Sequence, residues 1–301
     1  MLRDLQKGED AELAAAQAVI GHIDPDVLLL TDFDYDYDSM ALQTLAMLLD
    51  YPHHFAARPN TGVQTALDLD GNGWFGEARD AQGYGRFSGD GGMAVLSRFP
   101  IDAAQVTDHS HLLWRDVPDA VLPTTMTDDV AAVQRLSTSG HWIVPIKTDV
   151  STVNLLAFAA TPPVFDGPED RNGLRNRDEL RLWKHVLNRV YGDAPQDFVV
   201  IGNANLDPDK GDGIKDAMVK FLSDDRLQDP HVGLNTADWD DDGPGNLRVS
   251  YVLPATTWTV TDAGVFWPAP DDDHAALLGD DGLAAGVHHL VWVDVRRDAG
   301  Q

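Results

Sequence analysis

The sequence predicts a layered α/β or α+β domain. Two kinds of segment alternate along its 301 residues: short apolar runs that are typical of buried strands, and longer stretches with apolar residues at helical spacing. Long loops rich in Gly, Pro, Asn and Asp separate them at 52–90, 159–176 and 228–246, and loops of this kind often carry function. No repeat or linker divides the chain, so we expect a single domain over 1–301.

The order of the predicted elements follows from these patterns. Apolar periodicity predicts helices over 10–23, 39–49, 177–191 and 214–222. Apolar runs predict buried strands at 27–30, 92–97, 153–158, 198–201, 247–253 and 290–295. An apolar content of 43% is sufficient for a substantial core.

The chain is strongly acidic, with a formal net charge of −27 and only five glutamates among its 49 acidic residues. Such a surface repels phosphate backbones, so unaided binding of nucleic acid is disfavoured. We interpret the acidity as favouring solubility in a salty or calcium-rich medium, and a basic partner protein is the alternative. The lack of cysteine excludes disulfides and thiolate chemistry.

Membrane and targeting signals are not apparent in the sequence. No apolar run approaches the roughly 18 residues that a membrane span needs, and no basic segment followed by an apolar one marks a signal peptide. We therefore expect a soluble protein, which would be periplasmic or extracellular if the N-terminus is truncated.

Six motif segments occur in a definite order along the chain. One of them is Gly202-Asn203-Ala204-Asn205, directly after the predicted strand at 198–201. The six segments are 25–36, 91–101, 161–173, 202–205, 248–254 and 288–292. Together they resemble a bacterial branch of the endonuclease/exonuclease/phosphatase family. The resemblance implies a four-layered α/β/β/α sandwich with two mixed β-sheets flanked by helices. It also implies that the family's first strand, upstream of the helix at 10–23, is lacking.

The same resemblance implies a centre for phosphoester hydrolysis that uses Mg²⁺ or Mn²⁺. Asp32 stands where the family has a metal-binding Glu and would be a weak ligand for either ion. The alternative is a solvated acid in an Asp-rich loop. Asn205 and His288 match the family's Asn and His, so Asp32, Asn203, Asn205 and His288 form the expected remnant of the catalytic site.

Four positions replace ionisable groups of the family by neutral ones. They are Ala159 for a His, Asn203 for an Asp, and Ser250 and Val287 for acids. We therefore expect a protein of phosphoesterase lineage that is inactive or very weak. One alternative is an active Mg²⁺- or Mn²⁺-dependent phosphodiesterase or phosphatase that uses relocated acids on a small phosphoester. A second is a calcium-stabilised binding or surface protein.

A separate metal-binding pattern lies at 68–74. Asp68, Asp70 and Asn72 place oxygen ligands at alternate positions, glycines permit the turn, and Trp74 would offer its carbonyl. The twelfth position of the loop, which is Glu in an EF-hand, is Arg79 here, so we expect a different calcium loop that Asp80 closes. The alternative is an unoccupied acidic turn.

Three polar residues in and just after the motif segment 161–173 form a candidate substrate site. Arg171, Asn172 and Arg175 lie close together in the sequence and could hold a phosphate. The alternative is a loop that these residues hold together through their own hydrogen bonds.

Overall fold

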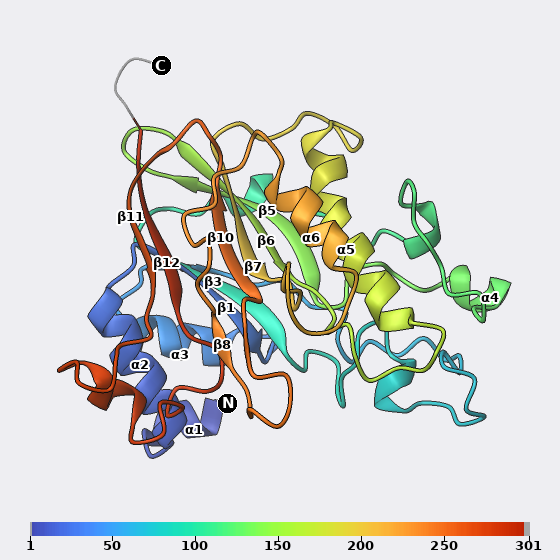
Figure 1. Ribbon diagram of the computed structural model, residues 1–301, viewed down its shortest axis with the longest axis horizontal. Helices are drawn as coiled ribbons and strands as arrows, with labels where there is room; N and C mark the ends of the chain where they lie inside the picture. The colour runs from blue at the N-terminus through green and yellow to red at the C-terminus, as the bar shows by residue number, and fades with distance from the viewer. Residues whose placement is uncertain (1, 298–301) are drawn as a thin grey trace.

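The computed structural model describes residues 2–297 and has a mixed α/β fold with several sheets (Figure 1). Its α-helices are α1 Leu2–Lys7, α2 Ala11–Ile23, α3 Met40–Leu48, α4 Asp128–Ala131, α5 Arg171–Leu187 and α6 Lys215–Leu222. Its strands are β1 Val27–Phe33, β2 His53–Phe55, β3 Gly92–Ser97, β4 Thr107–Asp108, β5 Gly140–Lys147, β6 Thr152–Ala159, β7 Phe198–Asn203, β8 Ala237–Asp238, β9 Asn246–Leu247, β10 Ser250–Pro254, β11 Thr259–Val265 and β12 Val291–Arg296. Among the helices of residues 2–297, none is long and apolar enough to cross a membrane.

Two larger sheets and two strand pairs organise the chain. The larger sheet has the order β10-β7-β6-β5-β4, and the smaller has the order β1-β3-β2. The larger sheet is mixed, because β6 and β7 pair in parallel while its other neighbours are antiparallel. The smaller sheet is antiparallel throughout. The prediction of two mixed sheets is therefore right for one sheet and wrong for the other.

The core lies on both faces of these sheets, because successive strand residues point to opposite sides. Met93 and Val95 of β3 pack with Trp142 of β5, between the two sheets. Their neighbours Ala94 and Leu96 pack instead with the apolar residues of α3.

The larger sheet divides its side chains in the same way. Leu156 and Phe158 of β6 face α5, where they pack with Leu180 and Trp183. Leu155 faces the other sheet. The helices α5 and α6 lie along this side of the larger sheet, and α2 and α3 lie beside the smaller one (Figure 1).

Several predicted boundaries need correction. The helix predicted at 177–191 begins at Arg171 and ends at Leu187. The strand predicted at 247–253 is divided into β9 and β10, because the backbone N–H groups at 248–250 donate to the side chains of Asp207 and Thr236 instead of to a neighbouring strand. The helix α1 and the strands β5 and β11 were not predicted.

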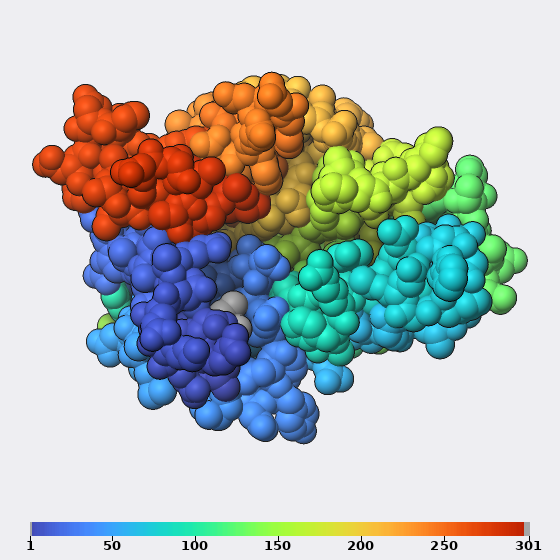
Figure 2. Space-filling model, turned by 90° about the horizontal axis from the view of Figure 1, so that it is seen from below, coloured from blue at the N-terminus to red at the C-terminus, as the bar shows by residue number. Residues whose placement is uncertain are grey.

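Part of the C-terminal third of the chain packs against the N-terminal helix α2. Figure 2 shows the C-terminal part, in red, resting on the N-terminal part, in blue, and a hollow between the orange and yellow-green segments above and the blue and cyan segments below. The rings of His22 in α2 and Phe266 contact each other, with centroids 5.2 Å apart. The helix α2 and the segment that follows β11 are therefore in direct contact.

Candidate functional site

Three of the replaced positions lie side by side at one end of the larger sheet. Ala159 at the end of β6 pairs with Asn203 at the end of β7, and Asn203 pairs with Ser250 at the start of β10. We call these three residues the strand-end row. A methyl, a carboxamide and a hydroxyl occupy it, and none of them ionises near neutral pH. The row therefore supplies neither a general base nor an anionic metal ligand.

The turn after β7 holds the Asn203–Asn205 pair in a tight backbone arrangement. The Oδ1 atom of Asn203 accepts a hydrogen bond from the backbone N–H of Asn205 at 2.9 Å, and Nδ2 of Asn205 donates to the carbonyl of Ala160 at 2.8 Å. A Cβ atom on Gly202 would lie 1.9 Å from the carbonyl oxygen of Phe158, so only glycine fits there. Both amides thus have structural roles in this turn.

Asp32 lies near the end of β1 at an irregularity of the β1–β3 ladder, with a left-handed φ of 59°. Its Oδ1 atom lies over Gly91, where a Cβ would approach it to 2.6 Å. Desolvation, followed by the negative charges of Asp34 and Asp90, raises the pKa of Asp32. Within residues 2–297, Asp32 belongs to no cluster of three or more groups that could hold a metal ion. Its role as a weak Mg²⁺ or Mn²⁺ ligand remains a prediction.

His288 lies beside β8. It forms an isolated bridge with Ala237, and its exposed ring contacts the edge of Trp239 with centroids 5.3 Å apart. Desolvation, followed by the charge of His289, lowers the pKa of His288, which favours the neutral ring. A neutral imidazole can still donate one hydrogen bond.

Two buried side chains of α5 connect the loops at this end of the sheet. Nδ2 of Asn176 donates to the carbonyls of Thr161 and Ala204, at 2.7 Å each. The carboxylate of Glu179 accepts from the backbone N–H groups of Thr138 at 2.5 Å and Thr161 at 2.7 Å. Both side chains are 0% exposed. These contacts join the loops after β6 and β7, which carry the strand-end row.

The buried carboxyl of Glu179 is electrostatically unusual. Desolvation raises the pKa of Glu179 to about 7, although Arg175 and the two N–H donors oppose the shift. Nearby, His141 contacts Oγ of Ser137 at 2.6 Å and the backbone carbonyl of Glu179 at 3.0 Å. Burial lowers the pKa of His141 to about 3. The sequence analysis missed both residues, and the only available signal was a charged residue inside the apolar pattern of α5.

The three residues predicted to hold a phosphate make hydrogen bonds within the protein. Arg171 donates to the carbonyl of Leu69 at 2.6 Å, and Asn172 donates to that of Val164 at 2.6 Å. Arg175 is 5% exposed, and its Nε and Nη2 atoms donate to backbone carbonyls, including that of Leu136 at 2.7 Å. All three residues lie in the helix α5 and not in a loop, and their hydrogen bonds hold this helix to neighbouring segments; their role in binding a phosphate remains a prediction.

The predicted calcium loop brings three carboxylates together. Asp68, Asp70 and Asp80 each offer an oxygen, and these oxygens lie within 4.8 Å of one another. Asp68 accepts from the backbone N–H groups of Gly71 and Gly73, at 2.7 Å each, and these bonds are among the causes that lower its pKa. The three oxygens are the hard ligands that Ca²⁺ prefers.

Other groups of this loop already contact the oxygen atoms that a Ca²⁺ ion would need. Nη1 of Arg79 pairs with Asp70 at 3.0 Å, and Asp80, which is 0% exposed, accepts from two backbone N–H groups. Oδ1 of Asn72 accepts from the backbone N–H of Trp74, whose side chain is exposed. The carboxylate set fits a cation, whereas Arg79 competes with it for Asp70.

Comparison with known proteins shows which family model and which solved structures this chain is similar to. The model of the endonuclease/exonuclease/phosphatase family matches residues 6–286. A comparison with curated protein sequences finds no match. Among solved structures, an endonuclease/exonuclease/phosphatase from Beutenbergia cavernae is similar at TM-score 0.59 and 16% identity, over 96% of this chain and 66% of that one. This chain thus spans just under two thirds of that structure.

Two further structures are similar over most of both chains. A family protein from Leptotrichia buccalis has TM-score 0.53 and 15% identity, over 97% of this chain and 94% of the other. A 3′ phosphatase from Neisseria, bound to a product DNA hairpin, has TM-score 0.55 and 16% identity, over 96% and 95%. At such identities the likeness concerns the fold. With the family model matching nearly the whole sequence, the chain belongs to the endonuclease/exonuclease/phosphatase family.

Proposed function

We propose that this chain is a family member whose phosphoesterase chemistry is lost or very weak. The strand-end row carries the proposal, because Ala159, Asn203 and Ser250 leave three adjacent positions without an ionisable group. Loss of a general base alone typically lowers a rate by about 10²–10⁴-fold. A divalent ion at this row would also lack anionic ligands, so the donor set does not fit Mg²⁺ or Mn²⁺ there.

Hydrolysis of bis-p-nitrophenyl phosphate with Mn²⁺ tests the proposal. We expect little or no turnover above the buffer rate, with or without EDTA. The variant Ala159→His/Asn203→Asp/Ser250→Asp is the matched comparison, and we expect it to gain turnover that EDTA removes. Robust EDTA-sensitive turnover by the unmodified chain would overturn the proposal.

A second candidate is an active metal-dependent phosphodiesterase or phosphatase with relocated acids, acting on a small phosphoester. Desolvation raises the pKa of Asp32, and the charges of Asp34 and Asp90 raise it further; a bound cation would relieve the repulsion among these carboxylates, which supports this candidate. In this case, Asp32→Asn should abolish the turnover that Mn²⁺ supports in the unmodified chain.

A third candidate is a calcium-stabilised binding or surface protein. The carboxylates of Asp68, Asp70 and Asp80 support it, and Ca²⁺ there would hold the long loop before β3. Arg171 already links this loop to α5 through the carbonyl of Leu69. Calcium would thus act on the loop that packs against the start of α5.

We also propose the architecture that the family resemblance implies. A four-layered α/β/β/α sandwich is supported by core clusters on the two outer faces and between the sheets. A single domain over 1–301 remains part of this proposal.

A further inference from the structure

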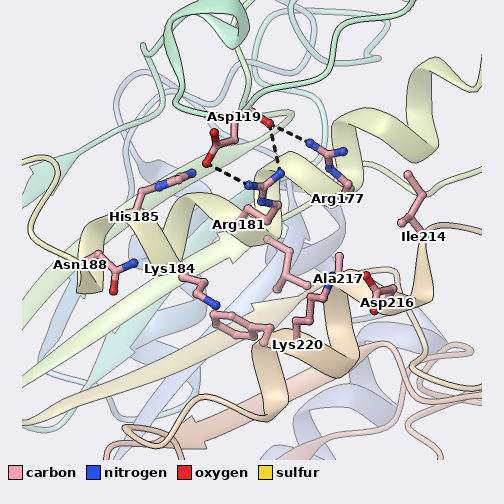
Figure 3. A pocket seen from close by; sticks show the side chains of 12 residues that line it. Asp119, Arg177, Arg181, Lys184, His185, Asn188, Ile214, Asp216, Ala217 and Lys220 are labelled. Carbon is pink, nitrogen blue, oxygen red and sulfur yellow. Dashed lines mark hydrogen bonds and ion pairs between the residues drawn. The ribbon is translucent and has the colours of Figure 1, made fainter.

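A cavity of about 410 Å³ lies between α5 and α6, and Figure 3 shows the side chains that line it. Its buried apolar lining includes Leu180, Ala217 and Phe221. We call it the α5–α6 groove. None of its lining residues belongs to the strand-end row or to the proposed remnant site. A volume of this size is in the range of small-molecule sites, which is about 300–1,000 Å³.

The charge of the α5–α6 groove is opposite to that of the protein as a whole. Arg177, Arg181 and Lys184 lie four and three residues apart on α5, so that they share one face, and Lys220 faces them from α6. The lining holds these four cations against two acids, Asp119 and Asp216, in a chain of net charge −27. Behind the lining, the buried Asp178 pairs with Arg177 at 2.6 Å and lies 3.9 Å from Arg181, so the excess of positive charge is carried by Arg181 and Lys184. Figure 3 shows the cationic side chains of α5 along one edge of the groove.

A protein carboxylate already lies at the cationic edge. The backbone carbonyl of Asp119 accepts from Arg177 at 2.9 Å and from Arg181 at 3.1 Å, and its carboxylate lies 3.4 Å from Nη2 of Arg181. The Asp119 side chain is 74% exposed, so this ion pair is weak and a competing anion can replace it.

The remaining cations are also available. Lys184 is exposed, and within the described residues it has no carboxylate partner within 4.0 Å. Lys220 pairs with Asp216 at 2.5 Å, where both side chains are more than 60% exposed. One edge of the groove therefore offers positive charge beside apolar core side chains that are at most 8% exposed at the base of the groove.

We propose that the α5–α6 groove binds a small organic anion, with an apolar body on Leu180, Ala217 and Phe221. Its carboxylate or phosphate group takes the place of the Asp119 carboxylate beside Arg181, and Lys184 lies three residues further along the same edge of the groove. The apolar lining accounts for the body, and the cationic edge accounts for the charge. This site is independent of whether the strand-end row retains any chemistry.

Calorimetric titration of the full chain with octyl phosphate and with octanoate tests the site. We expect saturable binding of at least one of them, and much weaker binding of inorganic phosphate and of octanol, because each has only half of the required chemistry. The stronger of the two ligands identifies whether the anionic group is a phosphate or a carboxylate. Inorganic phosphate that binds as tightly as octyl phosphate would overturn the apolar part of the proposal.

Charge variants locate the binding. Lys184→Glu should weaken binding by at least about tenfold, since a favourable charge contact becomes unfavourable. Asp119→Asn should tighten it by about two- to fivefold, because an exposed competing ion pair is removed. Asparagine suits the left-handed φ of 58° at this position.

Lys7→Glu on α1 is the matched control, because it makes the same change of net charge at an exposed position outside the groove. Equal weakening by Lys184→Glu and Lys7→Glu would overturn the proposed location. So would an unchanged affinity in Asp119→Asn. Circular dichroism of each variant confirms that the fold is retained.

Discussion

Replacing Glu179 by glutamine tests whether the buried acid of α5 holds a proton in the folded protein. Its carboxyl is 0% exposed, and desolvation raises its pKa from an ordinary 4.5 to about 7. A shift of this size corresponds to about 3 kcal/mol between the charged and neutral forms. Since the folded pKa lies above the unfolded one, the folded protein keeps a proton between pH 4.5 and 7 that the unfolded chain has released. The free energy of unfolding therefore falls by about 1.4 kcal/mol per pH unit as pH rises through this window.

Glutamine removes this titration and keeps the side-chain size. It accepts only one of the two N–H bonds from Thr138 and Thr161, so we expect a less stable protein at acidic pH. The stability advantage of the unmodified chain over Glu179→Gln should shrink by nearly 3 kcal/mol between about pH 5 and about pH 8.

Urea unfolding followed by tryptophan fluorescence measures this difference at each pH. The exposed Glu9→Gln controls for the loss of one negative charge from an acidic chain. Other groups, including His141, titrate in both proteins and cancel in the comparison. A difference that does not change with pH would refute the reasoning, because it would mean that the folded pKa of Glu179 is ordinary.

Three further predictions concern other parts of the molecule. Ca²⁺ should raise the melting temperature, and Asp68→Ala/Asp70→Ala should remove that increase; an equal increase in the double variant would exclude the loop. Gly202→Ala should destabilise by about 3 kcal/mol or more in urea unfolding, since its Cβ would lie 1.9 Å from the carbonyl oxygen of Phe158, and unchanged stability would contradict this close approach. Burial lowers the pKa of His141 to about 3, so the unfolded chain binds a proton at a higher pH than the folded protein does. Stability should therefore fall as pH drops below 6.5, and His141→Gln should remove up to about 5 kcal/mol of that loss.

The apolar runs of the sequence predicted the buried strands well. The predicted strand at 92–97 coincides with β3, and those at 153–158 and 198–201 lie within β6 and β7. By contrast, β5 contains Pro145 and begins with Gly140, which obscure a strand pattern. The first turns of α5 were missed because Arg175 and Asn176 are buried through hydrogen bonds, which apolar periodicity does not detect.

The candidate site was only partly accessible to sequence reasoning. The motif resemblance identified Ala159, Asn203 and Ser250 separately, but their adjacency depends on strand register, which the structure supplies. Arg175 and Glu179 lie on one helix, yet their partners at Leu136 and Thr138 are about 40 residues earlier in the chain. Such long-range backbone contacts leave no signal in local residue patterns.

The cationic edge of the α5–α6 groove has a consequence for binding rates. An anion approaching this protein from a distance meets the field of 27 excess negative charges, and it meets Arg181 and Lys184 only at close range. Added salt screens the distant repulsion first, since the Debye length is about 10 Å at 0.1 M. Moderate ionic strength should therefore accelerate the association of an anionic ligand, and higher ionic strength should accelerate its dissociation, so that occupancy passes through a maximum.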